Sequence, residues 1–322
     1  MKQCLRSVFR KCFYVLVLIL TLHFHSYSQL SLGNYFEAGF TAGPMVFLGD
    51  LGGNHGIGTT FVKDYNIPST RLSLGAFVEA HPAEWVGFRL QVNWGELYGN
   101  DNLIKPKGGD ENSRYNRNLD FRTQITEGFL GVELYPTVFI EDDPTSVFGR
   151  LRPYGMIGLG VFHFNPQGTY TANGTTSWVF LRPLHTEGEG FAEYPGRKEY
   201  SLTQLNIPMA VGVKYYFSDD LNLSFEVLYR KTFTDYIDDV STTYIDPALF
   251  AKYLSPGEAA IAASIYNKSP LRGVPGSGYN PGDQRGNSSN MDAYFTFGFK
   301  VGFRLNSGRE WRNSTHCPLL RF

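Results

Sequence analysis

Carboxylate and hydroxyl side chains are concentrated in one run of the sequence, residues 235–246, which reads DYIDDVSTTYID. Oxygen atoms of this kind are the ligands that Ca²⁺ prefers, so the run could hold a cation. Its spacing is not that of an EF-hand loop, and the same residue types also form hydrogen-bonded turns at the base of a loop. We favour the hydrogen-bonded loop and expect neither a metal ion nor a cofactor.

Histidine and serine residues give little sign of catalysis. Some eight-stranded membrane barrels modify lipids, which requires a Ser/His or similar pair near the end of a strand. His163 and His185 lie in or near regions that we expect to be loops, but no serine lies in a nucleophile-like motif. We therefore expect a protein without enzymatic activity.

Long strands must position these residues, and the clearest strand runs from Met291 to Leu305 (MDAYFTFGFKVGFRL). Apolar residues alternate without a break with polar residues and glycines, and every charge falls on the second face. This period of two predicts a β-strand with one apolar and one polar face. The run is about twice the length of a strand in a soluble domain and long enough to cross a bilayer at a tilt. We expect lipid on its apolar face.

Seven earlier segments carry the same alternation. In the fourth segment the phase is least clear, and we expect a slip or bulge near Gly128. The longest loop, 236–290, contains a run at 247–267 that predicts a helix broken at Pro256. The expected strands lie at about 35–48, 70–81, 86–95, 121–140, 150–164, 202–217 and 221–235.

The connections between these eight strands alternate between long and short. Outer-membrane barrels have an even number of strands, short periplasmic turns and long external loops. The sequence therefore predicts an all-β fold: an eight-stranded antiparallel transmembrane β-barrel of the outer membrane with long external loops, one of which contains a short helix. Both termini would lie in the periplasm. The alternative, a secreted β-sandwich, has no need to segregate its loops in this way.

Charged residues on the polar faces of the strands would point into the barrel. An eight-stranded barrel is just wide enough for side chains to fill it, and an unpaired ion there would cost on the order of several kcal/mol. Acids and bases roughly balance, which favours a salt-bridged plug over an ion-conducting pore. The predicted lumen network consists of Glu37, Glu79, Glu133, Glu226, Arg89, Arg152, Lys214, Arg230, Lys300 and Arg304.

The N-terminus resembles a secretory signal peptide. Basic residues precede the apolar run 13–22, and the small residues Ser26 and Ser28 lie at positions −3 and −1 of a cleavage site. A retained membrane anchor is disfavoured because the apolar run is shorter than the roughly 20 residues that a spanning helix needs. We expect a cleaved signal peptide at 1–28, the barrel at 29–305 and a periplasmic tail at 306–322.

Composition excludes two further classes. The 322 residues carry a formal net charge of −1, so no basic excess points to nucleic acid. Cleavage would remove Cys4 and Cys12 and leave Cys317 alone, which rules out an internal disulfide or a cysteine metal cluster. Cys317 would be an unpaired thiol or a bridge to a partner.

Several stretches resemble a family of Bacteroidota outer-membrane barrels, the PorG-like family of the type IX secretion system. They are Gly49-Asp50-Leu51, residues 151–160 (LRPYGMIGLG), residues 206–216 (NIPMAVGVKYY) and the run 235–246, and the tail with Cys317-Pro318 and Phe322 also agrees. The run 235–246 is the most specific part. Its family-like residues are Asp235, Tyr236, Asp238, Asp239, Ser241, Thr242, Thr243 and Tyr244.

The resemblance implies a non-enzymatic barrel that anchors a periplasmic lipoprotein ring of the secretion and gliding machinery to the outer membrane. Its partners would be outer-membrane lipids, the ring lipoprotein and associated subunits. The turns at 83–85, 141–149 and 218–220 and the tail with Cys317 would meet them. The alternative is an OmpA-like structural or ligand-binding barrel that is not tied to secretion.

Overall fold

The computed structural model describes residues 35–51, 67–105, 108, 111–140, 150–218, 220–272 and 279–305. The expected signal peptide and the expected tail with Cys317 lie outside these residues. Within the described part of the chain, no helix combines the length and the apolar character that crossing a membrane would require.

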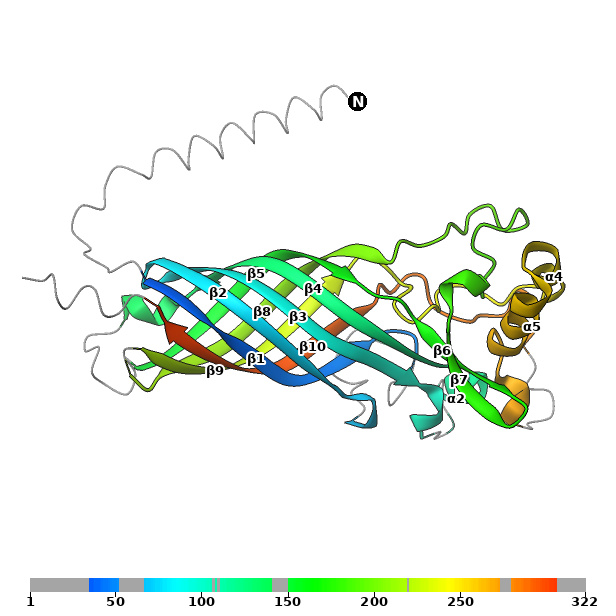
Figure 1. Cartoon of the computed structure of the whole chain (residues 1–322), viewed down its shortest axis with the longest axis horizontal. Helices are drawn as coiled ribbons and strands as arrows, with labels where there is room; N and C mark the ends of the chain where they lie inside the picture. The colour runs from blue at the N-terminus through cyan, green and yellow to red at the C-terminus, as the bar shows by residue number, and fades with distance from the viewer. Residues whose placement is uncertain are drawn as a thin grey trace, which may run out of the picture. The chain divides into compact units, whose positions relative to one another are not determined.

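Eight long antiparallel strands close into a barrel (Figure 1). Each strand pairs with its neighbours, and β1 pairs with β10 to complete the circle. The predicted eight-stranded antiparallel barrel is therefore confirmed. The strands are β1 (Tyr35–Leu48), β2 (Arg71–Ala83), β3 (Val86–Asn100), β4 (Asp120–Leu134), β5 (Leu151–His163), β8 (Thr203–Tyr216), β9 (Leu221–Thr232) and β10 (Ala293–Arg304).

Side chains alternate between the outer surface and the lumen along every strand. In β10, Phe299, Val301 and Phe303 are exposed, whereas Lys300 between them is buried. A continuous exposed apolar belt of this kind would promote aggregation in water, but it suits the hydrocarbon of a bilayer. Near the start of β10 the apolar face is covered instead, because Ala293 and Phe295 pack into a small buried cluster with the end of β1.

Two details of the strands differ from the expectation. β4 pairs with β3 and β5 in a continuous register, so the expected bulge near Gly128 is wrong. The register shift lies instead between Ala80 and Ala83, in the hairpin of β2 and β3. β4 also ends at Leu134, because Pro136 starts a short 3₁₀ helix there and cannot donate to a ladder.

A hairpin of two further strands lies in the segment 165–199, which we expected to be loop. β6 (Gln167–Ala172) pairs with β7 (Thr175–Phe180), and β6 joins the edge of β4 through Gln167 and Arg122. Asn173 and Gly174 connect the two strands with φ of 51° and 76°. Asn-Gly is the residue pair that a two-residue hairpin turn prefers, so the signal was present in the sequence.

The α-helices lie in the long connections at one end of the barrel, whereas the 3₁₀ helix 136–139 lies in the turn between β4 and β5 at the other end. The α-helices are α2 (Glu111–Arg117), α4 (Ala248–Tyr253) and α5 (Pro256–Ile265), with short 3₁₀ helices at 67–69, 101–103, 136–139, 182–184 and 269–272. The predicted break at Pro256 is confirmed. Ser255 caps α5 with its side chain, and Glu258 completes a capping box.

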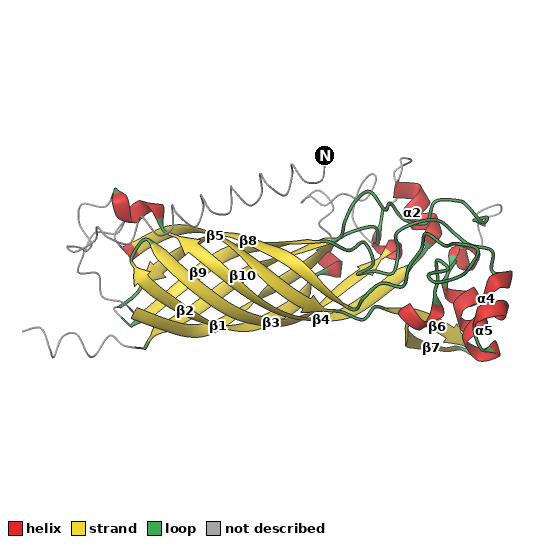
Figure 2. Ribbon diagram, turned by 90° about the horizontal axis from the view of Figure 1, so that it is seen from above, coloured by secondary structure: helices red, strands yellow, loops and turns green. Residues whose placement is uncertain are grey.

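The long connections gather at one end of the barrel (Figure 2), and their side chains pack into a core. We call the described residues of 101–119, 164–202, 233–272 and 279–292 the loop cap, its side of the barrel the loop end, and the opposite side the turn end. Ile237, Tyr244 and Phe250 are fully buried in a core that continues to Phe121 and Phe162 of the barrel wall. Tertiary packing therefore holds the loop cap on the barrel.

Candidate functional site

A cluster of buried charges fills the lumen toward the turn end. Each member comes from a different strand, and each is at most 2% exposed. The members of this lumen cluster are Glu37, Glu79, Arg89, Glu133, Lys214, Glu226 and Lys300. The structure thus brings together seven of the ten residues that we expected in the lumen network.

Arg89 lies at the centre of the lumen cluster. Its Nε lies 3.0 Å from Glu79 Oε1, its Nη1 lies 2.9 Å from Glu226 Oε2, and its Nη2 contacts Glu133. Lys300 Nζ lies 2.7 Å from Glu79 Oε1 and 3.3 Å from Glu133 Oε1. One guanidinium and one ammonium therefore hold three carboxylates.

Lys214 extends the cluster toward the rim. Its Nζ lies 3.0 Å from Glu79 Oε2 and 3.3 Å from Glu37 Oε1. Gly302 leaves the room that Glu37 needs, because a Cβ at this position would lie 2.1 Å from Glu37 Oε1. Tyr154 from β5 donates to Glu226 Oε2 at 2.7 Å, so every strand of the barrel contributes to the plug.

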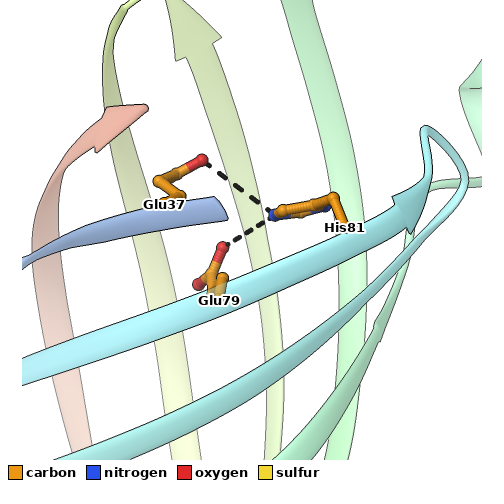
Figure 3. Close-up of side chains that lie close together, drawn as sticks. All are labelled: Glu37, Glu79 and His81. Carbon is orange, nitrogen blue, oxygen red and sulfur yellow. Dashed lines mark hydrogen bonds and ion pairs between the residues drawn. The ribbon is translucent and has the colours of Figure 1, made fainter. Parts of the chain in front are cut away.

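Glu37, Glu79 and His81 have the spacing of a metal site (Figure 3). One ligand atom from each lies within 4.8 Å of the others, and His81 Nε2 is 3.2 Å from Glu79 Oε2 and 4.0 Å from Glu37 Oε2. Lys214 already contacts both carboxylates, and Lys300 contacts Glu79. A divalent ion would meet these positive charges at short range, so the geometry favours an ion-pair network over a metal centre.

A second buried ion pair lies nearer the loop end. Arg230 Nη2 is 3.1 Å from Glu127 Oε2, and Asn93 and Asn206 donate to the same carboxylate at 2.8 and 2.6 Å. We did not expect Glu127 in the lumen. The signal was its spacing from Glu133 on the same face of β4, which the assumed bulge near Gly128 concealed.

The last two expected lumen residues lie at the turn-end rim, apart from the seven. Arg152 Nη2 pairs with Glu84 Oε2 at 3.2 Å, next to the turn between β2 and β3. The Arg304 guanidinium lies over the ring of Tyr35, 3.9 Å from its centroid. Both are near the ends of their strands, where long cationic side chains can reach past the lumen.

In the loop cap, Asp238 joins two of the stretches that we singled out in the sequence. Its Oδ2 accepts a hydrogen bond from Leu51 N at 2.9 Å, and its Oδ1 accepts from Val240 N at 3.0 Å. Asp239 has φ of 64°, and its carboxylate accepts from Thr186 Oγ1 at 2.5 Å and Tyr200 OH at 2.6 Å. These two aspartates therefore tie separate loops to the run 235–246.

The rest of the run binds a glutamate that sequence reasoning missed. Ser241 N and Thr242 N donate to the Glu187 carboxylate at 2.9 and 2.8 Å. Arg285 Nη1 pairs with the same carboxylate at 2.8 Å. We had expected Glu187 in an exposed loop, but it is fully buried, since it neutralises Arg285 and satisfies backbone donors.

Aromatic and hydroxyl side chains complete the base of the loop cap. Tyr236 stacks on Tyr200 with ring centroids 4.8 Å apart, and Tyr244 stacks on Tyr279 at 4.7 Å. Thr243 Oγ1 accepts from Arg197 at 2.6 Å. The run 235–246 therefore forms the hydrogen-bonded loop base that we favoured, except that the carboxylate of Asp235 has no hydrogen-bond partner among the described residues.

Burial raises the pKa of two carboxyl groups at the bottom of the loop cap, those of Asp239 and Glu189. The pKa of Asp239 is raised to about 6 by burial, although Arg285 opposes the shift. The pKa of Glu189 is raised to about 8, first by burial and then by the charges of Asp239 and Glu187. Both shifts disfavour the charged form, and burial is the main cause of each.

A cavity of about 350 Å³ opens in the loop cap. Arginine, tyrosine and carboxylate side chains line it, among them Asp50, Arg117, Tyr279, Asp283 and Arg285. Its size and its mixture of rings and charges suit a small polar ligand.

An imidazole–hydroxyl pair lies on the outer wall of the barrel. His163 Nδ1 is 3.1 Å from Thr203 Oγ1, and both residues are exposed. A catalytic histidine needs a group that orients its other ring nitrogen. Among the described residues, no carboxylate is bonded to that nitrogen of His163, so the pair matches a surface hydrogen bond better than a nucleophile.

Comparison with known proteins gives a family match. Residues 15–246 match the family model described as outer membrane protein beta-barrel domain. A search of curated proteins found no match.

Solved structures of other barrels resemble the chain only weakly. Ail, the attachment invasion locus protein of Yersinia pestis, is 6% identical with a TM-score of 0.34 over 84% of this chain and 97% of Ail. Neisserial surface protein A is 9% identical with a TM-score of 0.34 over 85% and 99%. A major outer membrane protein from Thermus thermophilus is 11% identical with a TM-score of 0.35 over 85% and 100%. At such TM-scores the likenesses carry no argument about this chain.

Proposed function

Because the chain belongs to the family of outer membrane protein beta-barrel domains, we propose that it serves in the outer membrane as an OmpA-like structural and ligand-binding barrel. The observation that carries this proposal is that the barrel and the loop cap are built differently. The lumen cluster fills the barrel with paired charges, whereas the loop cap has its own core and an open cavity. A filled lumen suits an anchor, and the loop cap suits recognition.

The orientation is part of the same proposal. Leu305 N donates to Phe36 O at 2.8 Å, so both ends of the described chain lie at the turn end. Outer-membrane barrels keep their short turns in the periplasm. The loop cap would then face the external medium, and both termini would be periplasmic.

Electrical recording tests the filled lumen. Purified protein in a planar bilayer should show no large steady conductance, because the ion pairs of the lumen cluster block the path. A large and stable conductance would instead indicate a pore and would contradict the proposal.

Deletion of the two helices tests the loop cap. A variant without residues 248–265 should lose envelope integrity or ligand binding while the barrel still inserts. A matched variant with substitutions in the turn at 218–220 should keep that function. The opposite pattern would move the function to the turn end.

Anchoring of the type IX secretion ring is the second candidate. The specific observation in its favour is that two of the family-like stretches, Gly49-Asp50-Leu51 and 235–246, meet through the bond from Leu51 N to Asp238. A barrel of this role would bind the periplasmic ring lipoprotein and associated subunits through its turns and its tail. Recovery of ring lipoproteins with the tagged chain from solubilised membranes would support this candidate, and their absence would weigh against it.

A non-enzymatic role is proposed for either candidate. The pair of His163 and Thr203 offers the clearest check, because it lies on the outer wall where a lipid could reach it. Lipid A from cells that carry His163→Ala should match lipid A from the wild type. Any difference would revive a lipid-modifying activity.

A further inference from the structure

Four buried carboxylates meet where the loop cap joins the barrel. Asp50 follows β1, Asp235 and Asp238 follow β9, and Asp292 precedes β10. They are 7%, 5%, 0% and 1% exposed, respectively. We call them the aspartate joint.

Backbone donors satisfy only part of the aspartate joint. Ile237 N donates to Asp292 Oδ2 at 2.8 Å, and Leu51 N and Val240 N donate to Asp238. Both carboxylate oxygens of Asp235 and Oδ1 of Asp292 are buried and have no hydrogen-bond partner among the described residues. Buried polar atoms of native proteins almost always have partners, so these three oxygens indicate a missing one.

Cationic side chains do not supply that partner. Within the described part of the chain, none of the four carboxylates of the aspartate joint forms an ion pair. Arg117 comes near, but its guanidinium pairs with Asp101 at 2.8 Å and donates to the backbone oxygen of Asp50 at 2.7 Å. The charge of Arg117 still acts on Asp50 and Asp238, whereas no cation is among the main influences on Asp235 and Asp292. A buried carboxylate without a counter-charge would cost several kcal/mol, on the order that isolated buried ions cost.

The proton affinities agree with this charge deficit. Burial, then the charges of Asp50 and Asp238, raise the pKa of Asp235 to about 9, and the neighbouring Ser241 hydroxyl offsets this only in part. Burial and the charges of Asp238 and Asp235 raise the pKa of Asp292 well above its usual range. Both shifts have the direction that a local shortage of positive charge produces.

A metal cation accounts for the three unpartnered oxygens better than protons do. A proton on Asp235 turns one of its oxygens into a donor, and even if that donor reached Asp292 Oδ1, the other oxygen of Asp235 would still have no partner. A cation would meet the free oxygens directly. Since every donor is a hard oxygen, the matching ions are Ca²⁺ and Mg²⁺.

We propose that the aspartate joint binds a partly hydrated divalent cation from the external medium, with Asp235 and Asp292 as its main ligands. Among the described residues, only the lumen trio Glu37, Glu79 and His81 brings three ligand atoms within 4.8 Å. The ion at the joint therefore keeps several waters and contacts few carboxylates at once, as Mg²⁺ and weakly held Ca²⁺ do. Such a site has a Kd on the order of 10⁻⁴–10⁻³ M.

Binding there would lock the base of the loop cap. The joint connects the end of β1 with both ends of the connection between β9 and β10, where that part of the loop cap leaves and re-enters the barrel. An ion shared by these segments would hold them in one arrangement. The proposal concerns the stability of the loop cap and holds for either of the two functions considered above.

The test uses the full chain in detergent after removal of divalent ions with a chelator. Calcium chloride alone, and magnesium chloride alone, are titrated by calorimetry into the wild type, Asp235→Asn, Asp292→Asn and the control Asp246→Asn. Asp246 is an exposed acid of the same run, so its loss removes one charge without touching the joint. Circular dichroism checks that each variant keeps the barrel.

The wild type and the control should show saturable binding of one ion for each chain. Asp235→Asn and Asp292→Asn should each weaken binding by about tenfold or more, since affinity follows the number of charged ligands. No saturable binding by the wild type up to about 10 mM, well above the expected Kd, would overturn the proposal. Equal binding by all four proteins would overturn it as well.

Protease protection provides a second readout. Calcium should slow cleavage within the loop cap of the wild type and of Asp246→Asn, but not of Asp235→Asn. If Asp235→Asn instead slows cleavage and calcium has no effect on the wild type, the joint stores protons and the proposal fails.

Discussion

The lumen of the barrel and the base of the loop cap both bury carboxylates, but the groups that bind these carboxylates differ. In the lumen cluster, Arg89, Lys214 and Lys300 contact four glutamates. At the base of the loop cap, Glu187 pairs with Arg285, but otherwise backbone N–H groups and hydroxyls bind the acids, and the aspartate joint has no ion pair among the described residues. Facing strands hold opposite charges at fixed positions, whereas loops bring their backbone close to the acid.

This difference predicts that the lumen cluster is sensitive to the loss of one cation. Substitution Arg89→Met would leave Glu79, Glu133 and Glu226 without their shared partner. We expect the free energy of unfolding to fall by about 3–5 kcal/mol, the usual cost of breaking a buried ion pair. Urea unfolding in detergent measures it. The control Arg152→Met at the rim should change the value by less than about 1 kcal/mol, and equal losses would show that the lumen cluster is not special.

In the loop cap the sensitive groups are acceptors. Asp238→Ala would leave Leu51 N and Val240 N without partners, at a cost of about 1–3 kcal/mol. Hydrogen exchange should therefore rise in the loop cap and stay unchanged in the strands. Asp238→Asn keeps one acceptor oxygen and should have a smaller effect. Exchange that rises equally in the barrel would show that the two regions unfold as one.

Response to pH should separate the two regions further. Asp235 has a folded pKa raised to about 9, against about 3.9 when unfolded. Protonated Asp235 therefore adds to the free energy of unfolding. This contribution is complete at a pH below the unfolded pKa and is lost as the pH rises through the folded pKa. With divalent ions removed, protease cleavage of the loop cap should speed up several-fold from pH 5 to pH 9, because Asp235 then faces the charges of Asp50, Asp238 and Asp292.

The variant Asp235→Asn serves as the control for this pH response. Its cleavage rate should depend less on pH, since the amide does not titrate. Added calcium should have the same flattening effect on the wild type. A slope that survives in the variant would assign the effect to another group, such as Glu189, whose pKa is raised to about 8.

The smallest effect should come from Glu37. The lumen cluster contains four carboxylates and three cations, and Lys214 would still contact Glu79 after Glu37→Gln. We expect the free energy of unfolding to change by less than about 1 kcal/mol, since the remaining charges balance. A loss as large as that of Arg89→Met would mean that Glu37 stabilises the fold by more than its contacts with Lys214 and His81.

Much of the barrel could be predicted from local pattern. The alternation in β10 separates Lys300 from Phe299 and Val301, and the same period places Glu79 and Lys214 inside. The position of Glu127 in the lumen was not predicted, because the slip that we expected at Gly128 would have put Glu127 on the other face of the strand from Glu133. The hairpin of β6 and β7 was not predicted either. Asn173-Gly174 indicates its turn, but its strands carry no clear apolar face.

The buried contacts of the loop cap could not be predicted from a local pattern. Nothing in the neighbourhood of Glu187 indicates burial, since the segment is rich in glycine, proline and charge. Its partners Ser241, Thr242 and Arg285 lie at least 54 residues away. Contacts of this separation depend on how several loops pack together, which a periodic pattern does not encode.

By itself, the sequence determined the eight barrel strands and most of the side chains that face the lumen, because a period of two depends only on neighbouring residues. The tertiary structure alone decided which acid meets which cation, since pairing follows the register between strands. It also decided that the backbone N–H of Leu51, the residue after Asp50, donates to Asp238, although 187 residues separate the two partners in the chain. Closure of the barrel brings the ends of β1, β9 and β10 together, and this closure gives the aspartate joint its chemistry.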